Sequence, residues 1–341
     1  MTPRSVARVV YVTARRAATG GRRRVQTEID LATSRRARAD LALFHELVPP
    51  PSGGGHQFLR ALLGELARRG LDVELNRISG GTSVCLVNSF NFDFARFARF
   101  ARRAGRVVHR VDGPIGVYRG FDDGTDALIA ALNARYADAT VVQSRFSLAA
   151  HRELDIELRD PVVIPNTVDP AIFHPPASRE PVSGRPVRLI AVSWSDNPNK
   201  GEETLTWLDR HLERSRYELT FVGRNQARFE RIRTVDPVPS SELAELLRSH
   251  DAYVAPSRND PCSNALLEAL ACGLPAVYLE SGGHPELVGE AGLPFTAPEE
   301  LPDVLDRLVS ELDERRAAIS VPALADVADS YLEVLGLASA G

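Results

Sequence analysis

Two carboxylates stand eight residues apart in residues 251–295, the stretch of the chain richest in chemical signals. Asp260 lies in a polar turn after a short apolar strand, and Glu268 lies in the middle of an expected helix from about 263 to 272. A strand, a polar turn and a helix N-terminus in this order often hold phosphate, because the free amides and the dipole at that end attract anions. The spacing predicts a crevice lined by both carboxylates. Asp260 would reach hydroxyl groups near the turn, and Glu268 would reach a more distant diol.

A second turn of small residues follows the next expected strand. It reads Ser281-Gly282-Gly283-His284-Pro285-Glu286 and opens another helix. Both turns come after strands of one parallel sheet, so we expect them at the same edge of that sheet. The candidate substrate contacts of the two turns are the helix start at Ser263, Asn264 and Ala265, together with Gly283 and His284.

At these residues the chain resembles family 4 of the retaining glycosyltransferases, which have the GT-B fold. That family's pattern is an acidic residue, a Glu eight positions later followed by small residues and Gly, and then a GG-x-P-E turn. Asp260 stands here where the family usually has Glu. The resemblance implies an α/β protein of two Rossmann-like doubly wound domains facing a central cleft. It also implies that Glu268 holds the ribose diol of a nucleotide sugar and that Asp260 bonds sugar hydroxyls.

The single lysine of the chain is a further candidate. Lys200 stands among 40 arginines, in a turn after the expected first strand of the second half. The ammonium of lysine is a compact charge, whereas the guanidinium of arginine is planar and extended. A single lysine among so many arginines therefore suggests a site that needs a compact charge. The resembled family holds the donor diphosphate with a Lys-Gly at this turn and usually has an Arg five residues earlier. Ser195 stands there in this chain, and Arg224 or Arg258 is the candidate to supply the missing charge.

Gly53, Gly54 and Gly55 form a glycine loop between the expected strand 41–47 and an amphipathic helix. The loop does not fit the G-x-G-x-x-G pattern of dinucleotide binding. In the resembled fold, a glycine loop at this position lets the backbone approach the donor phosphates and the acceptor. A plain flexible turn is the alternative.

Two strand ends in the first half carry polar candidates. His109 ends an expected strand, and the resemblance implies that it contacts the donor sugar near the reacting carbon, with Asp112 as an alternative for that place. A histidine at a strand end is also commonly an ordinary surface residue. Asn88 follows another expected strand and is a candidate for the acceptor side, with a simple polar turn as the equal alternative.

An acidic run, Asp122-Asp123-Gly124-Thr125-Asp126, has the residue types of a Mg²⁺ or Ca²⁺ site. It precedes an apolar series with helical spacing, so helix N-capping is the favoured interpretation. The resemblance also implies no bound metal and no cofactor, because helix N-termini and basic side chains neutralise the diphosphate.

The length of 341 residues exceeds what one hydrophobic core usually supports, so two domains are expected. The resemblance implies that the first domain is the acceptor side and the second binds the nucleotide sugar. The Arg-rich start has the composition of a targeting segment or a basic arm, or has no role. The expected units are an Arg-rich extension 1–40, a first domain 41–175, a linker 176–186, a second domain 187–321, and a C-terminal segment 322–341 whose helix crosses back to the first domain.

The composition limits the cellular compartments and the classes of binding partner that we expect for this protein. A net charge of −4 gives no general attraction to nucleic acid, and three cysteines without a framework or metal spacing predict a reducing, cytoplasmic environment. No apolar run approaches 18 residues, so no transmembrane segment is expected, while peripheral membrane contact stays open. The expected activity is sugar transfer with retention from a nucleotide-diphosphate sugar, with UDP the expected carrier, to an unidentified acceptor. A catalytically weak sugar-nucleotide-binding protein and a nucleotide-sugar epimerase are the alternatives.

Overall fold

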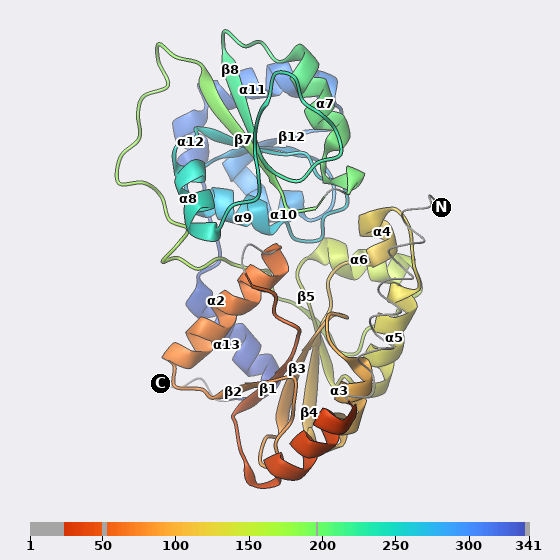
Figure 1. The fold of residues 1–341 in the computed structure, drawn as a ribbon. Coiled ribbons are helices and arrows are strands. Elements are labelled where there is room, and N and C mark those ends of the chain that lie inside the picture. The colour runs from red at the N-terminus through yellow and green to blue at the C-terminus, as the bar shows by residue number, and fades with distance from the viewer. Residues whose placement is uncertain (1–23, 50–52, 196, 338–341) are drawn as a thin grey trace.

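Two parallel sheets of six strands each form the frame of the protein (Figure 1). The computed structural model describes residues 24–49, 53–195 and 197–337. The first 23 residues of the expected extension and the last four of the C-terminal segment lie outside the described residues.

The first domain has strand order β2-β1-β3-β4-β5-β6. Its central strands are buried along their whole length, as expected for parallel strands covered by helices on both faces. The strands are β1 (Leu41–Phe44), β2 (Val73–Leu75), β3 (Val84–Asn88), β4 (Arg106–Arg110), β5 (Ala139–Val142) and β6 (Pro161–Val163). The helices are α2 (Gly54–Arg68), α3 (Phe94–Phe100), α4 (Ile115–Arg119), α5 (Thr125–Tyr136) and α6 (Arg145–Glu153).

The second domain has strand order β12-β11-β10-β7-β8-β9. The strands are β7 (Val187–Ser193), β8 (Tyr217–Gly223), β9 (Arg233–Val235), β10 (Ala252–Ala255), β11 (Ala276–Leu279) and β12 (Gly292–Phe295). The helices are α7 (Glu202–His211), α8 (Ser240–Arg248), α9 (Asn264–Ala271), α10 (His284–Val288), α11 (Leu301–Ser310) and α12 (Leu312–Ala317). The last helix, α13 (Leu324–Leu335), follows them in the chain but packs on the first domain.

Each sheet reverses its strand order once, and these reversals locate the crevices. In the first domain the chain leaves β1 for β2 and returns on the other side at β3. In the second domain it runs from β7 to β9 and then continues on the opposite side of β7 at β10. Ligands of open α/β sheets bind where strand order reverses, beyond the carboxyl ends of the strands. The loops after β7 and β10 carry Lys200 and Asp260.

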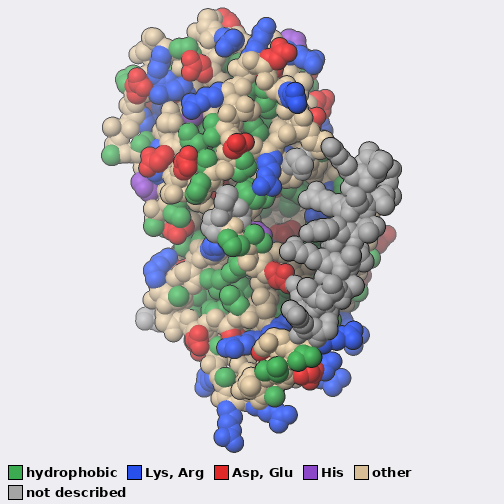
Figure 2. Space-filling model, in the orientation of Figure 1, with side chains coloured by type: hydrophobic (Ala, Val, Ile, Leu, Met, Phe, Trp, Pro, Cys, Tyr) green, Lys and Arg blue, Asp and Glu red, His purple; other side chains and the backbone are tan. Residues whose placement is uncertain are grey.

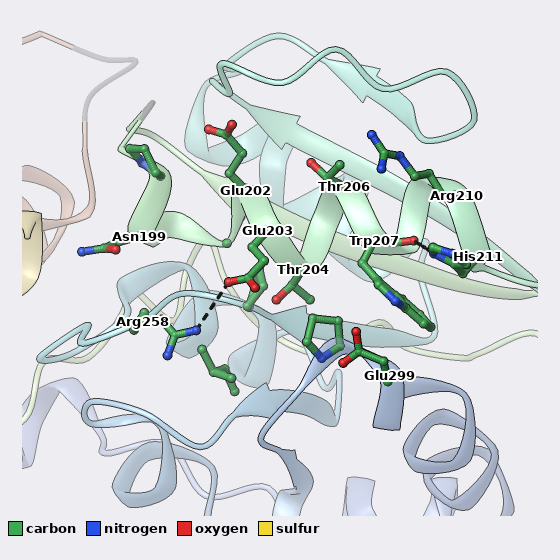
Figure 3. Close-up of a pocket in the computed structure, with 15 residues that line it drawn as sticks. Asn199, Glu202, Glu203, Thr204, Thr206, Trp207, Arg210, His211, Arg258 and Glu299 are labelled. Carbon is green, nitrogen blue, oxygen red and sulfur yellow. Dashed lines mark hydrogen bonds and ion pairs between the residues drawn. The ribbon is translucent and has the colours of Figure 1, made fainter.

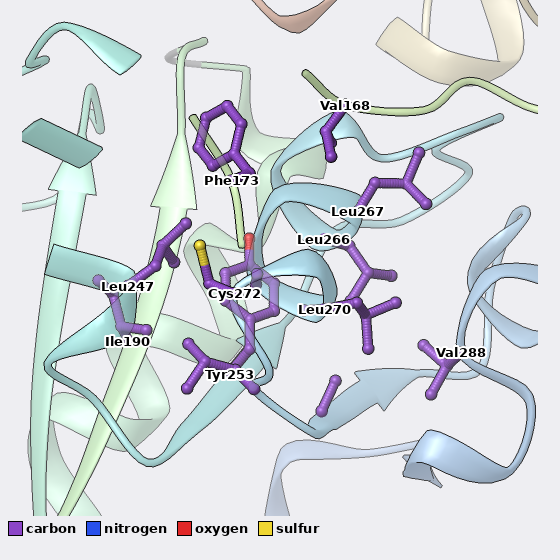
Figure 4. Packing of buried hydrophobic residues seen from close by; sticks show 14 of the residues in the cluster. Val168, Phe173, Ile190, Leu247, Tyr253, Leu266, Leu267, Leu270, Cys272 and Val288 are labelled. Atoms are coloured by element: carbon purple, nitrogen blue, oxygen red, sulfur yellow. The ribbon is translucent and has the colours of Figure 1, made fainter. Parts of the chain in front are cut away.

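The helix α9 is apolar on nearly all sides because it is enclosed. Leu266, Leu267 and Leu270 are buried in a cluster with β7, β10 and α8 (Figure 4). Val168 and Phe173, which precede the expected linker, belong to the same cluster. A helix that is hydrophobic all round must be buried. Residues 168–173 therefore pack into the second domain, although the expected boundary placed them in the first.

Both ends of the described chain pack on the first domain. The C-terminal helix α13 lies beside α2 (Figure 1) and buries Tyr331 and Leu332 against it. Residues 24–33 form a helix, and Asp30 of this helix is ion-paired to Arg96 of α3 at 2.6 Å. The described part of the expected extension 1–40 thus packs on the first domain through this helix.

The surface is hollowed between the two domains in the space-filling view (Figure 2). Arginine side chains are scattered over both domains and gather at the end of the first domain far from the second (Figure 2). Within the described parts of the chain, no helix combines the length and the apolar character needed to cross a membrane.

Candidate active site

Lys200 and Asp260 form an ion pair at the point where the second sheet reverses its order. The Nζ of Lys200, at the end of a short 3₁₀ helix (Pro198–Lys200), lies 2.6 Å from Oδ2 of Asp260. Their side chains are 20% and 5% exposed. Burial alone lowers the pKa of Lys200, but the attraction of Asp260 outweighs it and raises this pKa above its ordinary value. Both groups are therefore charged at neutral pH.

The carboxylate of Asp260 also contacts groups of its own domain other than Lys200. Ser257 Oγ lies 3.4 Å from Oδ2 of Asp260 and 3.0 Å from Nε2 of His284. The backbone amide of Cys262 donates to Oδ1 of Asp260 at 3.3 Å. His284 is fully buried, and burial lowers its pKa. The ring packs against Ser257 beside Asp260, so the expected contact of His284 with substrate stays a prediction. The crowded carboxylate also favours a positioning role for Asp260 over the expected contact with sugar hydroxyls.

The two small-residue turns nest against each other, as expected from their place at one sheet edge. The amide of Gly283 donates to the carbonyl of Asp260 at 2.8 Å. A Cβ on Gly283 would lie 2.4 Å from the carbonyl oxygen of Pro261. Gly283 therefore lets the turns approach closely, and its part is to bring Asp260 into position.

The N-termini of α2 and α9 meet across the domain boundary. Ser263 is the N-cap of α9, and its side chain accepts a hydrogen bond from the amide of Leu266. A Cβ on Gly54 would lie 2.4 Å from Cβ of Asn264, and a Cβ on Gly53 would lie 3.0 Å from Cδ1 of Trp194. The glycine loop thus touches the second domain closely. Both helices direct the positive ends of their dipoles toward this contact, which suits an anion.

Gly55 and Ala265 complete the two helix starts. A Cβ on Gly55 would meet no described atom within 4 Å, so no described part of the chain approaches this position closely. Ala265 is half-buried in the first turn of α9. Of the three glycines, it is Gly53 and Gly54 that the contact between the domains requires.

Glu268 is buried in the middle of α9. Its side chain makes no hydrogen bond or ion pair with any residue that the structure describes. Burial raises its pKa to about 8, so a large fraction of the molecules hold it protonated at neutral pH. A buried carboxylate without partners costs free energy. It therefore has capacity to accept hydrogen bonds from a ligand.

Arg224 and Arg258, the two candidates for the missing charge, lie in different places. The guanidinium of Arg224 stacks over the ring of Trp194, 4.5 Å from its centre, next to the glycine loop. Arg258 points toward Glu203 at 3.6 Å and lines a separate pocket of about 490 Å³ (Figure 3). That pocket is lined by the second domain only and contains neither Lys200 nor Asp260. Arg224 lies beside the glycine loop, while the side chain of Arg258 lines a pocket next to the Lys200 turn, and the choice between the two stays a prediction.

His109 and Asn88 do not reach open space. His109 is fully buried, its Nε2 lies 3.1 Å from the carbonyl of Ser89, and its Nδ1 lies 3.2 Å from Nδ2 of Asn133 in α5. Burial lowers its pKa to about 4. Asn88 is also buried and bonds to neighbouring side chains. Their expected contacts with substrate therefore stay predictions, and Asp112, with 41% of its side chain exposed, is the alternative candidate after β4.

A buried polar network, which we did not predict, connects the two domains. Arg110 donates to Asn88 at 2.8 Å, to Asp112 at 2.8 Å and to Asn166 at 2.9 Å. Asn166 in turn donates to Asn264 at 3.0 Å. Asn166 was visible in the sequence as part of a polar element before the linker, but nothing local indicated its partner. The network ties the end of β4 to the start of α9.

Two histidines extend this network to the glycine loop. His45 lies 3.1 Å from Nδ2 of Asn88 and 2.9 Å from Nδ1 of His56. Burial, with help from His56 and Arg110, lowers the pKa of His45 to about 3, so it is neutral. The sequence offered one indication that His45 belongs to the site. It directly follows β1, the strand at which the first sheet reverses its order.

The three carboxylates of the acidic run accept backbone hydrogen bonds, and no described side chain caps α5, the helix that the run was expected to cap. Asp126 accepts hydrogen bonds from the amides of Ile115 at 2.7 Å and Gly116 at 2.8 Å, so it caps α4 rather than its own helix. Asp122 accepts from the amide of Gly124, and Asp123 accepts from that of Thr125. Among the residues with described positions, no group of three or more His, Cys, Asp or Glu could hold a metal ion.

Comparisons with known proteins agree with this geometry. Residues 196–311 match the family model described as Glycosyl transferases group 1. A stretch of 90 residues is 37% identical to D-inositol 3-phosphate glycosyltransferase of Corynebacterium jeikeium, covering 25% of this chain. That stretch spans only 22% of the curated relative's length.

Solved structures extend the likeness to both domains. Sucrose-phosphate synthase from Thermosynechococcus elongatus superposes with a TM-score of 0.66 at 17% identity, over 88% of this chain and 95% of that one. HepE of Anabaena in complex with UDP gives a TM-score of 0.59 at 15% identity, over 87% and 95%. The fold is therefore GT-B, two parallel-sheet α/β domains. The match to the Glycosyl transferases group 1 model, over residues 196–311, lies within the second domain.

Proposed function

We propose that this protein is a retaining glycosyltransferase that moves a sugar from a nucleotide-diphosphate sugar to an acceptor hydroxyl. The observation that carries the proposal is the meeting of the α2 and α9 N-termini beside the pair of Lys200 and Asp260. Such a place attracts a diphosphate, because amides, dipoles and an ammonium converge there. A UDP sugar is the proposed donor, since the HepE structure of the same fold is a complex with UDP.

Departure of the diphosphate is the step that this site would favour. The bond between the anomeric carbon and the phosphate oxygen breaks, and the electron pair stays on the phosphate. Lys200 and the amides at the start of α9 stabilise that charge, which is where preorganised donors contribute most. The acceptor oxygen bonds to the same face of the carbon, and its proton passes to the departing phosphate. Neither a protein nucleophile nor a metal ion takes part in this proposal.

The remaining side chains are assigned by position. Glu268 would hold the ribose diol, because its buried carboxylate has no partner among the residues that the structure describes. Arg224 would supply the charge that Ser195 does not, since it stacks on Trp194 beside the glycine loop. The acceptor would lie at the first domain, near His56 and Asp112.

A sugar-nucleotide-binding protein with weak catalysis is the second candidate. Two observations favour it: Ser195 stands at a place where charge is expected, and the ammonium of Lys200 is already engaged by Asp260. An epimerase of similar architecture would act on the donor without any acceptor. The three activities are separable in one assay.

The test is a panel of nucleotide sugars screened by thermal shift, followed by an NMR time course. The donor that raises the melting temperature most is incubated alone and then with candidate acceptors. Transfer with the donor's anomeric configuration kept in the product supports the proposal. Binding without transfer or hydrolysis supports the binding protein, and a change in the sugar of the donor alone supports the epimerase.

A further inference from the structure

The short helix α4 of the first domain is held by asparagines of the second domain. The carbonyl of Tyr118 accepts hydrogen bonds from Nδ2 of Asn197 at 3.3 Å and from Nδ2 of Asn199 at 3.1 Å. The carbonyl of Val117 accepts from Nδ2 of Asn259 at 3.4 Å. The last carbonyls of a helix have no partner within it. The second domain thus completes the C-terminal end of α4.

The side chain of Tyr118 uses the same contact to reach Lys200. The Nζ of Lys200 lies 4.7 Å from the centre of the Tyr118 ring. A cation over an aromatic face is attracted by the ring, more strongly when water is excluded. Next to it, a Cβ on Gly113 would lie 2.8 Å from Cβ of Pro261, so the two domains are in close contact here. The ammonium is therefore enclosed by Asp260 from its own domain and by Tyr118 from the other.

We propose that Tyr118 is a positioning residue of the first domain, one that sets Lys200 for its task only while the two domains are closed. This inference rests on the proposed function, in which Lys200 stabilises the departing diphosphate. The three asparagine contacts hold α4, and α4 carries Tyr118 onto the ammonium. If the two domains open, the asparagine contacts to α4 and the contact of Tyr118 with Lys200 are lost together.

The geometry of the Lys200 ammonium explains how Tyr118 could position it. An ammonium has three N–H donors and a freely rotating bond. Asp260 takes one donor, and Tyr118, whose ring and hydroxyl both interact with the ammonium, occupies a second side. The third donor is then left for a phosphate oxygen. Without the ring, water takes its place and Lys200 has more orientations to lose when the transition state forms.

The test compares Tyr118→Ala and Tyr118→Phe, with Phe121→Ala as the matched control. Phe121 lies three residues further on, is 61% exposed and has no part in the site. A cation–π contact in a desolvated place is worth up to about 2 kcal/mol, which corresponds to a fold-change of roughly 5 to 30. Tyr118→Ala should lower kcat by about 5- to 30-fold while the Kd for UDP changes by less than about threefold. Tyr118→Phe keeps the ring but loses the hydroxyl, which also interacts with the ammonium of Lys200, so its kcat should lie between those of the wild type and Tyr118→Ala.

A second measurement tests the closure itself without relying on activity. The double variant Asn199→Ala/Asn259→Ala loses two of the contacts that hold α4. Its radius of gyration in small-angle X-ray scattering, without ligand, should exceed that of the wild type and of Phe121→Ala. Unchanged scattering, or a Tyr118→Ala enzyme with kcat within twofold of the wild type, overturns the inference. If the wild type transfers no sugar from any donor, the proposed function fails, and the scattering still decides whether α4 holds the domains closed.

Discussion

The ammonium of Lys200 lies 2.6 Å from Oδ2 of Asp260, so the single lysine of the chain has its own counter-ion in the candidate site. Breaking a buried ion pair on one side leaves an uncompensated charge, which costs about 3–5 kcal/mol. A substitution of Lys200 therefore has a structural effect as well as a catalytic one. The two must be separated in any experiment on this residue.

Lys200→Ala should lower kcat by about 100-fold or more, which is comparable to the loss of one preorganised oxyanion donor. The loss in kcat should exceed the loss in donor affinity, because charge builds on the phosphate only as the glycosidic bond breaks. Lys200→Arg should restore activity in part, since a planar fork does not reproduce a point charge. Steady-state kinetics with an accepted donor measures both effects.

A double variant separates stability from catalysis. Lys200→Met/Asp260→Asn removes both charges, so it should regain most of the unfolding free energy that Lys200→Ala loses. It should not regain kcat. If Lys200→Ala keeps kcat within about threefold of the wild type, the phosphate site lies elsewhere.

Gly54→Ala should weaken binding of UDP, because its Cβ would lie 2.4 Å from Cβ of Asn264 and one domain would have to move. Overpacking of this kind typically costs about 1–3 kcal/mol, or about 5- to 150-fold in affinity. Gly64→Ala is the matched control, since it lies in the same helix and its Cβ meets nothing within 4 Å. Isothermal titration with UDP compares the two variants. Equal dissociation constants would show that the glycine loop does not shape the donor site.

The sequence was informative where the signal is local. A strand, a polar turn and a helix start can be recognised from a few neighbouring residues, and the turns at 260 and 283 do lie together as predicted. Partners far apart in sequence could not be inferred, because Lys200 and Asp260 are brought together only by the strand order. His109 and Arg110 point to opposite faces of β4, since side chains alternate along a strand. No local pattern reveals that Asn133 of α5 covers the face of His109.

Removing divalent metal ions should leave the transfer rate unchanged. The carboxylates of Asp122, Asp123 and Asp126 already accept backbone hydrogen bonds, and Asp126 caps α4. The proposed chemistry relies on Lys200 and helix N-termini for charge stabilisation. The measurement is the initial rate with and without EDTA. Activity that disappears with EDTA and returns with Mg²⁺ or Mn²⁺ would assign a metal to the reaction.

Glu268→Ala should weaken nucleotide binding by about 10- to 150-fold at a pH above about 8, where the carboxyl is ionised, because hydrogen bonds to a charged group contribute about 1.5–3 kcal/mol. The fold should survive, since the wild-type carboxylate makes no interaction with other described side chains. Glu245, on the exposed side of α8, provides the control variant Glu245→Ala. Titration with UDP and circular dichroism measure the two properties. An unchanged dissociation constant would remove Glu268 from the ribose site.

Glu268 should also make the unfolding free energy fall as pH rises from about 4.5 to about 8. Burial raises the pKa of this carboxyl to about 8 in the folded protein, while the unfolded chain keeps the ordinary value near 4.5. Between these two values the folded state binds one proton more than the unfolded state, so raising the pH favours unfolding. Above about 8 both states are ionised, and the contribution of Glu268 becomes constant.

The comparison of wild type with Glu268→Gln isolates this residue from all other titrating groups. Glutamine resembles the protonated acid and does not titrate, so the variant lacks the pH-dependent loss. Its melting temperature relative to the wild type should rise steadily from pH 5 to pH 8 and then stay level. A difference that is the same at pH 5 and pH 8 would mean that the folded state holds Glu268 ionised. Some positive group would then have to face α9 in solution, and the carboxylate would no longer be free to accept the ribose hydroxyls.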